Sequence, residues 1–326
     1  MMKKIILIIF IITGVFETKA QLFPVLGGQR AGISTAQFLK IGVGGRASAL
    51  GDAFVAIAND ASALYWNPAG LSQFQDNEIF FSHNQWVVDI NHDFLGAVYH
   101  LDLNNSFGVA VTSLSMKDMP VTTEYAPFGT GEYFGFGDLA FAVTYSRRMT
   151  DQFSFGGTVR YIEETLDKLK MRGVMIDLGT YYWTGLGSTR FAVTVSNFGN
   201  QLAPDGEVVL VGKRKLSQWQ SFSPPTMFRI GFAFEPYQDD MNKITTAIQL
   251  NHPNDNSENV STGAEYSWKE MFFLRGGYKF NVEEQNYTFG AGLKVPIAIA
   301  VFTFDYAYSN FSRLGSAHRF SIILGL

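Results

Sequence analysis

From residue 77 to the C-terminus, large apolar residues alternate with small or polar ones in runs of strand length. In residues 139–148, every second residue is large and apolar: Leu139, Phe141, Val143 and Tyr145. The same alternation recurs in three further runs: residues 153–161, 227–235 and 319–326. A period of two is typical of β-strands whose two faces meet different surroundings. We therefore expect an all-β structure from residue 77 onward, with one continuously apolar face.

The pattern predicts about fourteen strands, with starts good to about 2–4 residues. These starts are Glu78, Asp93, Ser106, Leu139, Phe153, Gly173, Arg190, Thr226, Lys243, Asn259, Met271, Tyr287, Ala298 and Ala317. Connections after even-numbered strands are mostly short, whereas those after odd-numbered strands tend to be longer and include the two longest, residues 117–138 and 200–225. Short turns at one end and long loops at the other, with an even strand number, are typical of a transmembrane antiparallel β-barrel of the outer membrane.

A soluble β-sandwich or propeller also alternates, but its second face meets water and is rich in Lys and Glu. Here the second face is rich in Gly, Ala, Ser and Thr, and only 17% of all residues are charged, against about 25% in average soluble domains. Its isolated ions share the less apolar register: Arg148, Arg160, Asp177, Arg229, Glu265, Arg275, Lys294, Asp305 and Arg319. A charge facing lipid at the bilayer midplane costs about 2–4 kcal/mol. We therefore expect these ions inside the lumen, as structural ion pairs; a transport role is the alternative.

The chain is also rich in aromatic residues, with 30 Phe and 14 Tyr. Outer-membrane barrels carry girdles of aromatic side chains at both membrane interfaces. The residues that fit such girdles are Tyr145, Tyr181, Tyr182, Trp183, Tyr266, Trp268, Tyr306 and Tyr308.

The N-terminus has the pattern of a secretory signal peptide. Lys3 and Lys4 precede an apolar run at residues 5–12, and Thr18 and Ala20 supply small residues before Gln21. The run is shorter than the roughly 20 apolar residues that a membrane-spanning helix needs. We therefore expect residues 1–20 to be cleaved during export.

Residues 21–76 do not alternate. Residues 46–58 are rich in Ala with apolar residues at helical spacing, and a short helical run at 61–66 leads to the turn Asn-Pro-Ala-Gly at 67–70. Irregular backbone at membrane depth is tolerated only inside protein or along a water-filled cavity. We therefore expect residues 21–76 to form a helical and loop plug in the lumen, and residues 77–326 to form the barrel.

Residues 42–47 fit the nucleotide-binding fingerprint G-x-G-x-x-A. A Rossmann site would need a second parallel strand that completes a βαβ unit, whereas this chain continues with a proline turn and alternating strands. We expect the glycines to allow close backbone packing in a crowded lumen, and we predict no cofactor.

Residues 45–70, GRASALGDAFVAIANDASALYWNPAG, resemble the N-terminal signature of the PorV/PorQ family of Bacteroidetes-type outer-membrane proteins. That family is related to the FadL-type fatty-acid transporters, whose plug contains a similar Asn-Pro-Ala motif. Trp66 before the Asn-Pro pair is nearer to the PorV branch, and residues 318–321 extend the resemblance to the C-terminus. The resemblance implies a fourteen-stranded barrel with a lumenal plug. For the PorV branch it implies type IX secretion, in which cargo is collected at the translocon and delivered to the attachment machinery at the cell surface.

The residues of the plug that we expect to matter most are Arg46, Asp52, Trp66, Asn67, Pro68 and Gly70. Arg46 and Asp52 are expected to pair with each other or with lumenal ions, and thereby to anchor the plug to the wall. Pro68 fixes a turn, and Asn67 can cap the chain through its side chain. These residues either hold the plug in place or take part in gating.

The two longest loops are expected to be extracellular and to expose aromatic side chains: Tyr125, Phe128, Tyr133, Phe134, Phe136, Trp219 and Phe222. Exposed apolar groups of this kind mark a surface for a partner or a hydrophobic ligand. The alternative is that they fold over the mouth of the barrel.

No pattern in the sequence indicates an enzyme. The five His are scattered, with neither an H-E-x-x-H motif nor metal-ligand spacing, and a G-x-S-x-G motif is absent. The absence of Cys excludes thiolate chemistry and disulfides. We therefore predict no catalytic residues and no metal site. The net charge of −4 argues against a nucleic-acid partner.

Two functions remain. The first is a PorV-like interaction protein of type IX secretion, which contacts membrane lipid and binds the translocon or secreted cargo proteins. The second is a FadL-like transporter of hydrophobic small molecules. A continuous apolar pocket from the long loops to the plug would favour transport, whereas a closed polar lumen with exposed apolar loops would favour the interaction role.

Overall fold

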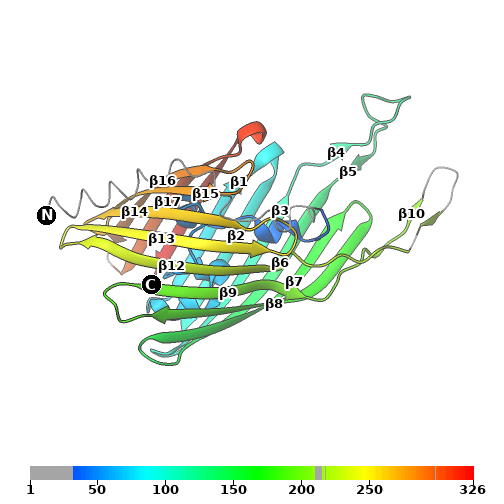
Figure 1. Ribbon diagram of the computed structural model, residues 1–326. Helices are drawn as coiled ribbons and strands as arrows, with labels where there is room; N and C mark the ends of the chain where they lie inside the picture. Colours follow the sequence, from blue (N-terminus) through cyan, green and yellow to red (C-terminus); the bar gives the residue numbers. More distant parts are fainter. Residues whose placement is uncertain (1–31, 210–214, 217, 298) are drawn as a thin grey trace.

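The computed structural model describes residues 32–209, 215–216, 218–297 and 299–326. Within these residues, fourteen strands form one closed antiparallel barrel around a short helical segment (Figure 1). The expected signal peptide, residues 1–20, lies outside the described residues. No described helix is both long enough and apolar enough to cross a membrane.

The barrel strands follow one another around the wall in chain order, and β1 closes the barrel by pairing with β18, where Ile79 faces Leu324. Their bounds are β1 (Glu78–Gln85), β2 (Asn91–His100), β3 (Asn105–Ser115), β6 (Phe136–Arg148), β7 (Phe153–Leu166), β8 (Leu169–Trp183), β9 (Arg190–Gly199), β12 (Met227–Gln238), β13 (Asn242–Pro253), β14 (Asn259–Trp268), β15 (Phe272–Phe280), β16 (Tyr287–Ile297), β17 (Ala300–Asn310) and β18 (Ser316–Gly325). The predicted fold class is confirmed. Each predicted start lies within a few residues of the observed one, and the largest difference is at β8, which begins at Leu169 instead of Gly173.

The long connections carry elements of their own. The connection between β3 and β6 contains the hairpin of β4 (Met119–Pro120) and β5 (Tyr133–Phe134), and the connection between β9 and β12 contains β10 (Val208–Val209) and β11 (Lys215–Leu216). Figure 1 shows both hairpins projecting beyond the same end of the barrel. Short 3-10 turns, η4 (Val87–Asp89) and η5 (Ser312–Leu314), lie in two other loops at this end. We call it the long-loop end, and the opposite end the short-turn end.

Alternate residues of each strand face opposite sides of the wall, as the period of two predicts. On β6, Val143 is 48% exposed on the outer face, whereas its neighbour Thr144 is fully buried on the lumenal face. The outer face of the wall is therefore apolar, as lipid requires. The lumenal face carries the polar and charged residues, together with apolar ones such as Phe80 and Phe94.

The N-terminal segment fills the lumen. It comprises η2 (Gln37–Lys40), α2 (Gly45–Ala49), α3 (Ala63–Trp66) and η3 (Pro68–Gln73), and we call residues 34–73 the plug. Phe54, Leu64 and Trp66 of the plug are at most 3% exposed and belong to a buried apolar cluster that also contains wall residues. The shared cluster makes the plug an integral part of the barrel core.

The helix expected over residues 46–58 is much shorter in the structure, because α2 ends at Ala49. Gly51 and Asp52 have positive φ angles of 65° and 63°, which end the helix. At this point the plug touches the wall, since a Cβ atom added at Gly277 of β15 would overlap the backbone of Leu50 and Gly51. The tertiary contact therefore overrides the local preference for helix.

Candidate functional site

The turn at Asn67 and Pro68 joins two parts of the plug to the barrel wall. The side chain of Asn67 is fully buried, and its Oδ1 accepts a hydrogen bond of 3.0 Å from the backbone N–H of Ala69, the cap of η3. Its Nδ2 donates to the carbonyl of Val55 at 2.9 Å and to that of Thr180 on β8 at 3.1 Å. The Asn67 amide therefore has partners for both of its ends, as buried polar groups require.

Pro68 and Gly70 fit beside Asn67 only because neighbouring residues are small. A Cβ atom at Gly179 of β8 would contact Asn67 and Pro68, and one at Gly156 of β7 would overlap the backbone of Pro68 and Ala69. Gly70 itself packs against Ala58, where a side chain would overlap the Ala58 carbonyl. The indole Nε1–H of Trp66 donates to the carbonyl of Val43 at 2.9 Å, so Trp66 joins the start and the end of the plug.

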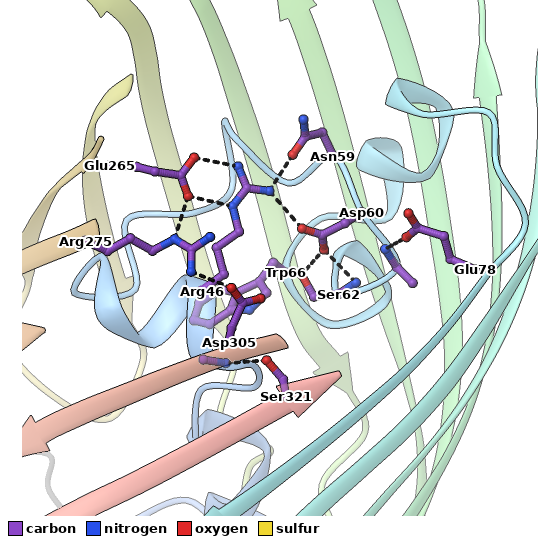
Figure 2. A network of polar contacts seen from close by, with 12 residues as sticks. Arg46, Asn59, Asp60, Ser62, Trp66, Glu78, Glu265, Arg275, Asp305 and Ser321 are labelled. Atoms are coloured by element: carbon purple, nitrogen blue, oxygen red, sulfur yellow. Dashed lines mark hydrogen bonds and ion pairs between the residues drawn. The ribbon is translucent and has the colours of Figure 1, made fainter. Parts of the chain in front are cut away.

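Arg46, on α2, joins the plug to β14 (Figure 2). Its guanidinium donates to Glu265 through Nε at 3.0 Å and through Nη2 at 3.1 Å, a bidentate pair. Its Nη1 donates to Asp60 at 2.9 Å and to Asn59 at 2.7 Å, which tie the next loop of the plug to the same cation.

The network continues along the wall (Figure 2). Glu265 also accepts from Nε of Arg275 at 2.6 Å, and Arg275 pairs with Asp305 of β17 at 2.5 Å. Negative and positive groups therefore alternate from Asp60 to Asp305, and each buried charge lies beside an opposite one. Buried charges need such partners because ionic groups lose their hydration inside a protein.

Asp52 does not pair with Arg46. Its carboxylate instead binds the ammonium group of Lys279 on β15, which gives the plug a second ionic contact with the wall. Of the two alternatives that the sequence left open, pairing between the two plug residues or pairing with the wall, the structure has the second for both Arg46 and Asp52.

The nine ions expected in the lumen all lie on the lumenal register. Arg160 pairs with Asp177 at 2.8 Å. Arg229 donates to Ser196 and Arg319 donates to Ser309, each at 2.8 Å. Arg148 donates to the carbonyl of Ser72 in the plug. Lys294 lies with Arg46, Glu265, Arg275 and Asp305 around a polar cavity of about 200 Å³ at the short-turn end.

A larger cavity of about 790 Å³ opens at the long-loop end. Its walls come from the first residues of the plug, including Phe38 and Ile41, and from the barrel and its loops, including Trp86 and Leu114. None of the described residues lines both cavities, and the buried apolar cluster of the plug lies between them. The lumen therefore has an open mouth and a filled centre.

The beginning of the plug is held to a loop of the barrel at this mouth. Asp255, between β13 and β14, accepts from Nζ of Lys40 and Nε2 of Gln37, both at 2.7 Å. Burial opposes ionisation of Asp255, but the hydrogen bonds from Lys40 and Gln37 outweigh it, and they lower the pKa of its carboxyl group below the usual range.

The aromatic residues expected on the long loops fall into two groups. Tyr125 and Phe128 are 97% and 101% exposed on the arm that carries β4 and β5, and Tyr133 of β5 is 67% exposed. Three others, Phe134, Trp219 and Phe222, are only partly exposed. The indole N–H of Trp219 donates to the carbonyl of Gly206, and the backbone of Phe222 forms an isolated β-bridge with Leu202. Phe136 is not a loop residue, because it begins β6 and lines the large cavity.

Two of the expected girdle residues face the lumen instead of the membrane. Tyr181 is 1% exposed and donates to the carbonyl of Ala56, and Trp183 donates to Gln73. Both side chains fill space against the plug. They share the register of Asp177, which was expected in the lumen, so the alternation along the strand was the available signal.

The family model of the type IX secretion system protein PorV matches residues 27–254. The chain belongs to the PorV family. It is therefore a component of type IX secretion and an outer-membrane β-barrel, whose apolar outer face contacts lipid. Among curated proteins, none matches the chain significantly.

Solved structures show the same fold at low sequence identity. The toluene transporter TbuX of Ralstonia pickettii has a TM-score of 0.58 and 13% identity, with 87% of this chain and 97% of that chain covered. The channel CymD, a monoaromatic hydrocarbon channel, has a TM-score of 0.58 and 14% identity over the same shares. A FadL homologue from Pseudomonas aeruginosa has a TM-score of 0.56 and 12% identity, with 90% and 97% covered. PorV and the proteins of these structures are secretion components, channels and transporters, not enzymes.

Several residues of the site were missed from the sequence. Lys279 lies on the same face of β15 as Arg275, so the strand register was the available signal. Arg190 and Glu235, which pair at 2.8 Å, lie at the ends of their strands, where solvent exposure is the usual expectation. Asp138 and Glu164 face each other on β6 and β7 at the mouth.

Proposed function

We propose that this PorV-family protein works at the cell surface as a binding component of type IX secretion, and not as a conduit. The observation that carries the proposal is the filled centre of the lumen, where Arg46 and Asp52 each pair with a wall residue of opposite charge. Both pairs hold the plug in the lumen, in the way of a polypeptide that would cross it. The long-loop end, with its open mouth and projecting aromatic arm, is the surface that remains for partners.

We propose that three segments of the chain have different roles. Residues 1–20 direct export, residues 21–76 are the N-terminal segment that provides the plug, and residues 77–326 form the barrel. In the plug, Arg46, Asp52, Trp66, Asn67, Pro68 and Gly70 hold the lumen closed, and the lumenal charges of the wall serve as their partners. The exposed aromatics Tyr125 and Phe128 contact the translocon or secreted cargo. In this scheme the protein has no catalytic step.

The test is purification of the tagged full chain in a gentle detergent, followed by mass spectrometry of the proteins and lipids that remain bound. Stoichiometric recovery of a very large barrel, or of secreted proteins that share a C-terminal domain, is the expected result. A clean monomer that carries a fatty acid or another apolar molecule would contradict the proposal and favour transport.

Transport of a hydrophobic small molecule is the second candidate, and the apolar cavity of about 790 Å³ favours it. The solved structures of similar fold include the toluene transporter TbuX. A transported molecule would enter this cavity and then need movement of the plug, because the buried cluster blocks the way to the short-turn end. Uptake of a labelled apolar compound by vesicles that contain the purified chain would distinguish the two functions.

A further inference from the structure

The cavity at the long-loop end contains a carboxylate without a partner. Asp138 of β6 points into the cavity and is only 8% exposed. None of the described residues donates a hydrogen bond to it or forms an ion pair with it, in contrast to the buried carboxylates of the plug network. A buried charge without a partner is costly, so such a group is stabilised either by a proton or by a ligand that supplies the missing charge.

The groups around Asp138 make its site still more favourable for a positive charge. Glu164 lies directly opposite on β7 and lines the same cavity. It accepts from the backbone N–H of Ala36 at 2.9 Å and from the hydroxyl of Thr35, which are neutral donors. The cation that the described lining provides is Lys40, and its ammonium group is bound to Asp255 at 2.7 Å. Two neighbouring carboxylates therefore face an apolar space with no cation of their own.

A second polar group in the lining also lacks a partner. Gln285 is 9% exposed, and its Oε1 accepts from Lys279, but its Nε2 has no hydrogen-bond acceptor among the described residues. The cavity therefore offers an acceptor for a cation at Asp138, between apolar walls that include Phe38, Trp86 and Phe136. The Gln285 Nε2 belongs to the same lining but is buried away from the open space.

These features fit a polypeptide better than a fatty acid. A fatty-acid carboxylate in this cavity would place a third anion near Asp138 and Glu164, which electrostatic repulsion opposes. A peptide with a basic residue among apolar ones presents a cation, backbone carbonyls and apolar side chains together. We propose that the cavity binds a polypeptide segment in which a Lys or Arg lies among apolar residues, with its charge against Asp138. The proposal deepens the binding function above and depends on it for the source of the segment.

The test uses the purified full chain in maltoside micelles and three acetylated, amidated peptides of the form Leu-Phe-X-Leu-Phe, where X is lysine, norleucine or glutamate. Binding is measured by calorimetry. We expect the lysine peptide to bind at least tenfold more tightly than the other two. The preference should fall to about twofold or less in Asp138→Asn, which keeps the shape of the side chain. It should persist in Asp151→Asn, which removes the same charge at an exposed short turn.

Folding of each variant is checked by the heat-dependent mobility of the barrel in gels, so loss of binding cannot be confused with loss of structure. Equal binding of the three peptides, or an unchanged preference in Asp138→Asn, would overturn the proposal.

Hexylammonium is the fourth probe. If it bound as tightly as the lysine peptide and with the same dependence on Asp138, the site would bind free amines and the polypeptide would be the wrong occupant. Recovery of secretion partners by the wild-type chain tests the proposed function separately, since it can succeed when the peptides fail.

Discussion

Arg46 of the plug and Glu265 of β14 share two hydrogen bonds, of 3.0 and 3.1 Å, across the interface between the plug and the wall. The two residues are far apart in the chain, so this pair closes a long loop and fixes the position of α2. The same guanidinium holds Asp60, which begins the second half of the plug. One side chain therefore connects three segments that are separate in sequence: α2, the loop at Asp60 and β14.

Replacement of Arg46 by Met should release the plug from the wall. The change leaves Asp60 without its cation and Glu265 with Arg275 alone. Breaking a buried ion pair by removing one partner costs about 3–5 kcal/mol, so we expect a loss of that size in urea unfolding. Lys243→Met is the matched control, because its contact with Glu270 is 3.9 Å long and solvent-exposed. A loss below about 1 kcal/mol, the level of a surface pair, would show that the network does not hold the plug.

Replacement of Asn67 by Leu should destabilise the turn that precedes η3. Leucine has a similar size but leaves the N–H of Ala69 and the carbonyls of Val55 and Thr180 without the partners they have now. Each unsatisfied buried group costs about 1–3 kcal/mol, so the total effect should exceed that of any single lost hydrogen bond. Urea unfolding measures it, with Asn104→Leu as the control, because Asn104 is exposed at a short turn and its side chain forms no hydrogen bond with the described residues. Equal losses for the two variants would contradict the special role of Asn67.

The alternation of the strands was enough to predict the barrel, its strand number and the side of each lumenal ion. It could not predict which ions meet. Arg46 and Asp52 have opposite charges and lie six positions apart, yet they bind Glu265 and Lys279 on different strands. Such pairs depend on the path of the plug through the lumen. That path is determined by contacts between residues that are far apart in sequence. The error at Tyr181 and Trp183 has another origin: they are alternate residues on the same face of β8 as Asp177, so the register already predicts a lumenal position, and there they bond to plug residues.

The outer face of β6 should tolerate apolar residues and reject charges. Val143 is 48% exposed on that face, and Val143→Arg would place a cation among lipid tails. For Arg near the bilayer midplane the cost is about 2–4 kcal/mol. We therefore expect reduced folding yield into lipid vesicles and lower stability, whereas Val143→Leu should fold like the wild type. Similar yields for the arginine and leucine variants would place Val143 outside the hydrocarbon layer.

Acid should loosen the start of the plug before it unfolds the barrel. The pKa of Asp255 is lowered from its ordinary value of 3.8 because, against the effect of burial, Lys40 and Gln37 stabilise the carboxylate. A carboxyl group with a depressed folded pKa contributes stability above its unfolded pKa and loses it as the pH falls through the folded value. Below pH 3.8, hydrogen exchange of residues 34–41 should therefore rise more steeply than that of the strands. Asp255→Asn should remove this extra dependence on pH, and a variant that kept it would assign the effect to another group.

The exposed aromatic arm offers the most direct test of the binding function. Tyr125 and Phe128 are almost fully exposed and touch little of the barrel, so Tyr125→Ser with Phe128→Ser should change the free energy of unfolding by no more than about 0.5 kcal/mol. If the arm contacts a secretion partner, the loss of two large apolar side chains should reduce recovery of that partner several-fold in detergent pull-downs. Leu103→Ser is the matched control, because Leu103 is 75% exposed at a short turn on the opposite end of the barrel. Equal recovery by the arm variant and the control would exclude the arm from the interface and leave the mouth of the barrel as the binding surface.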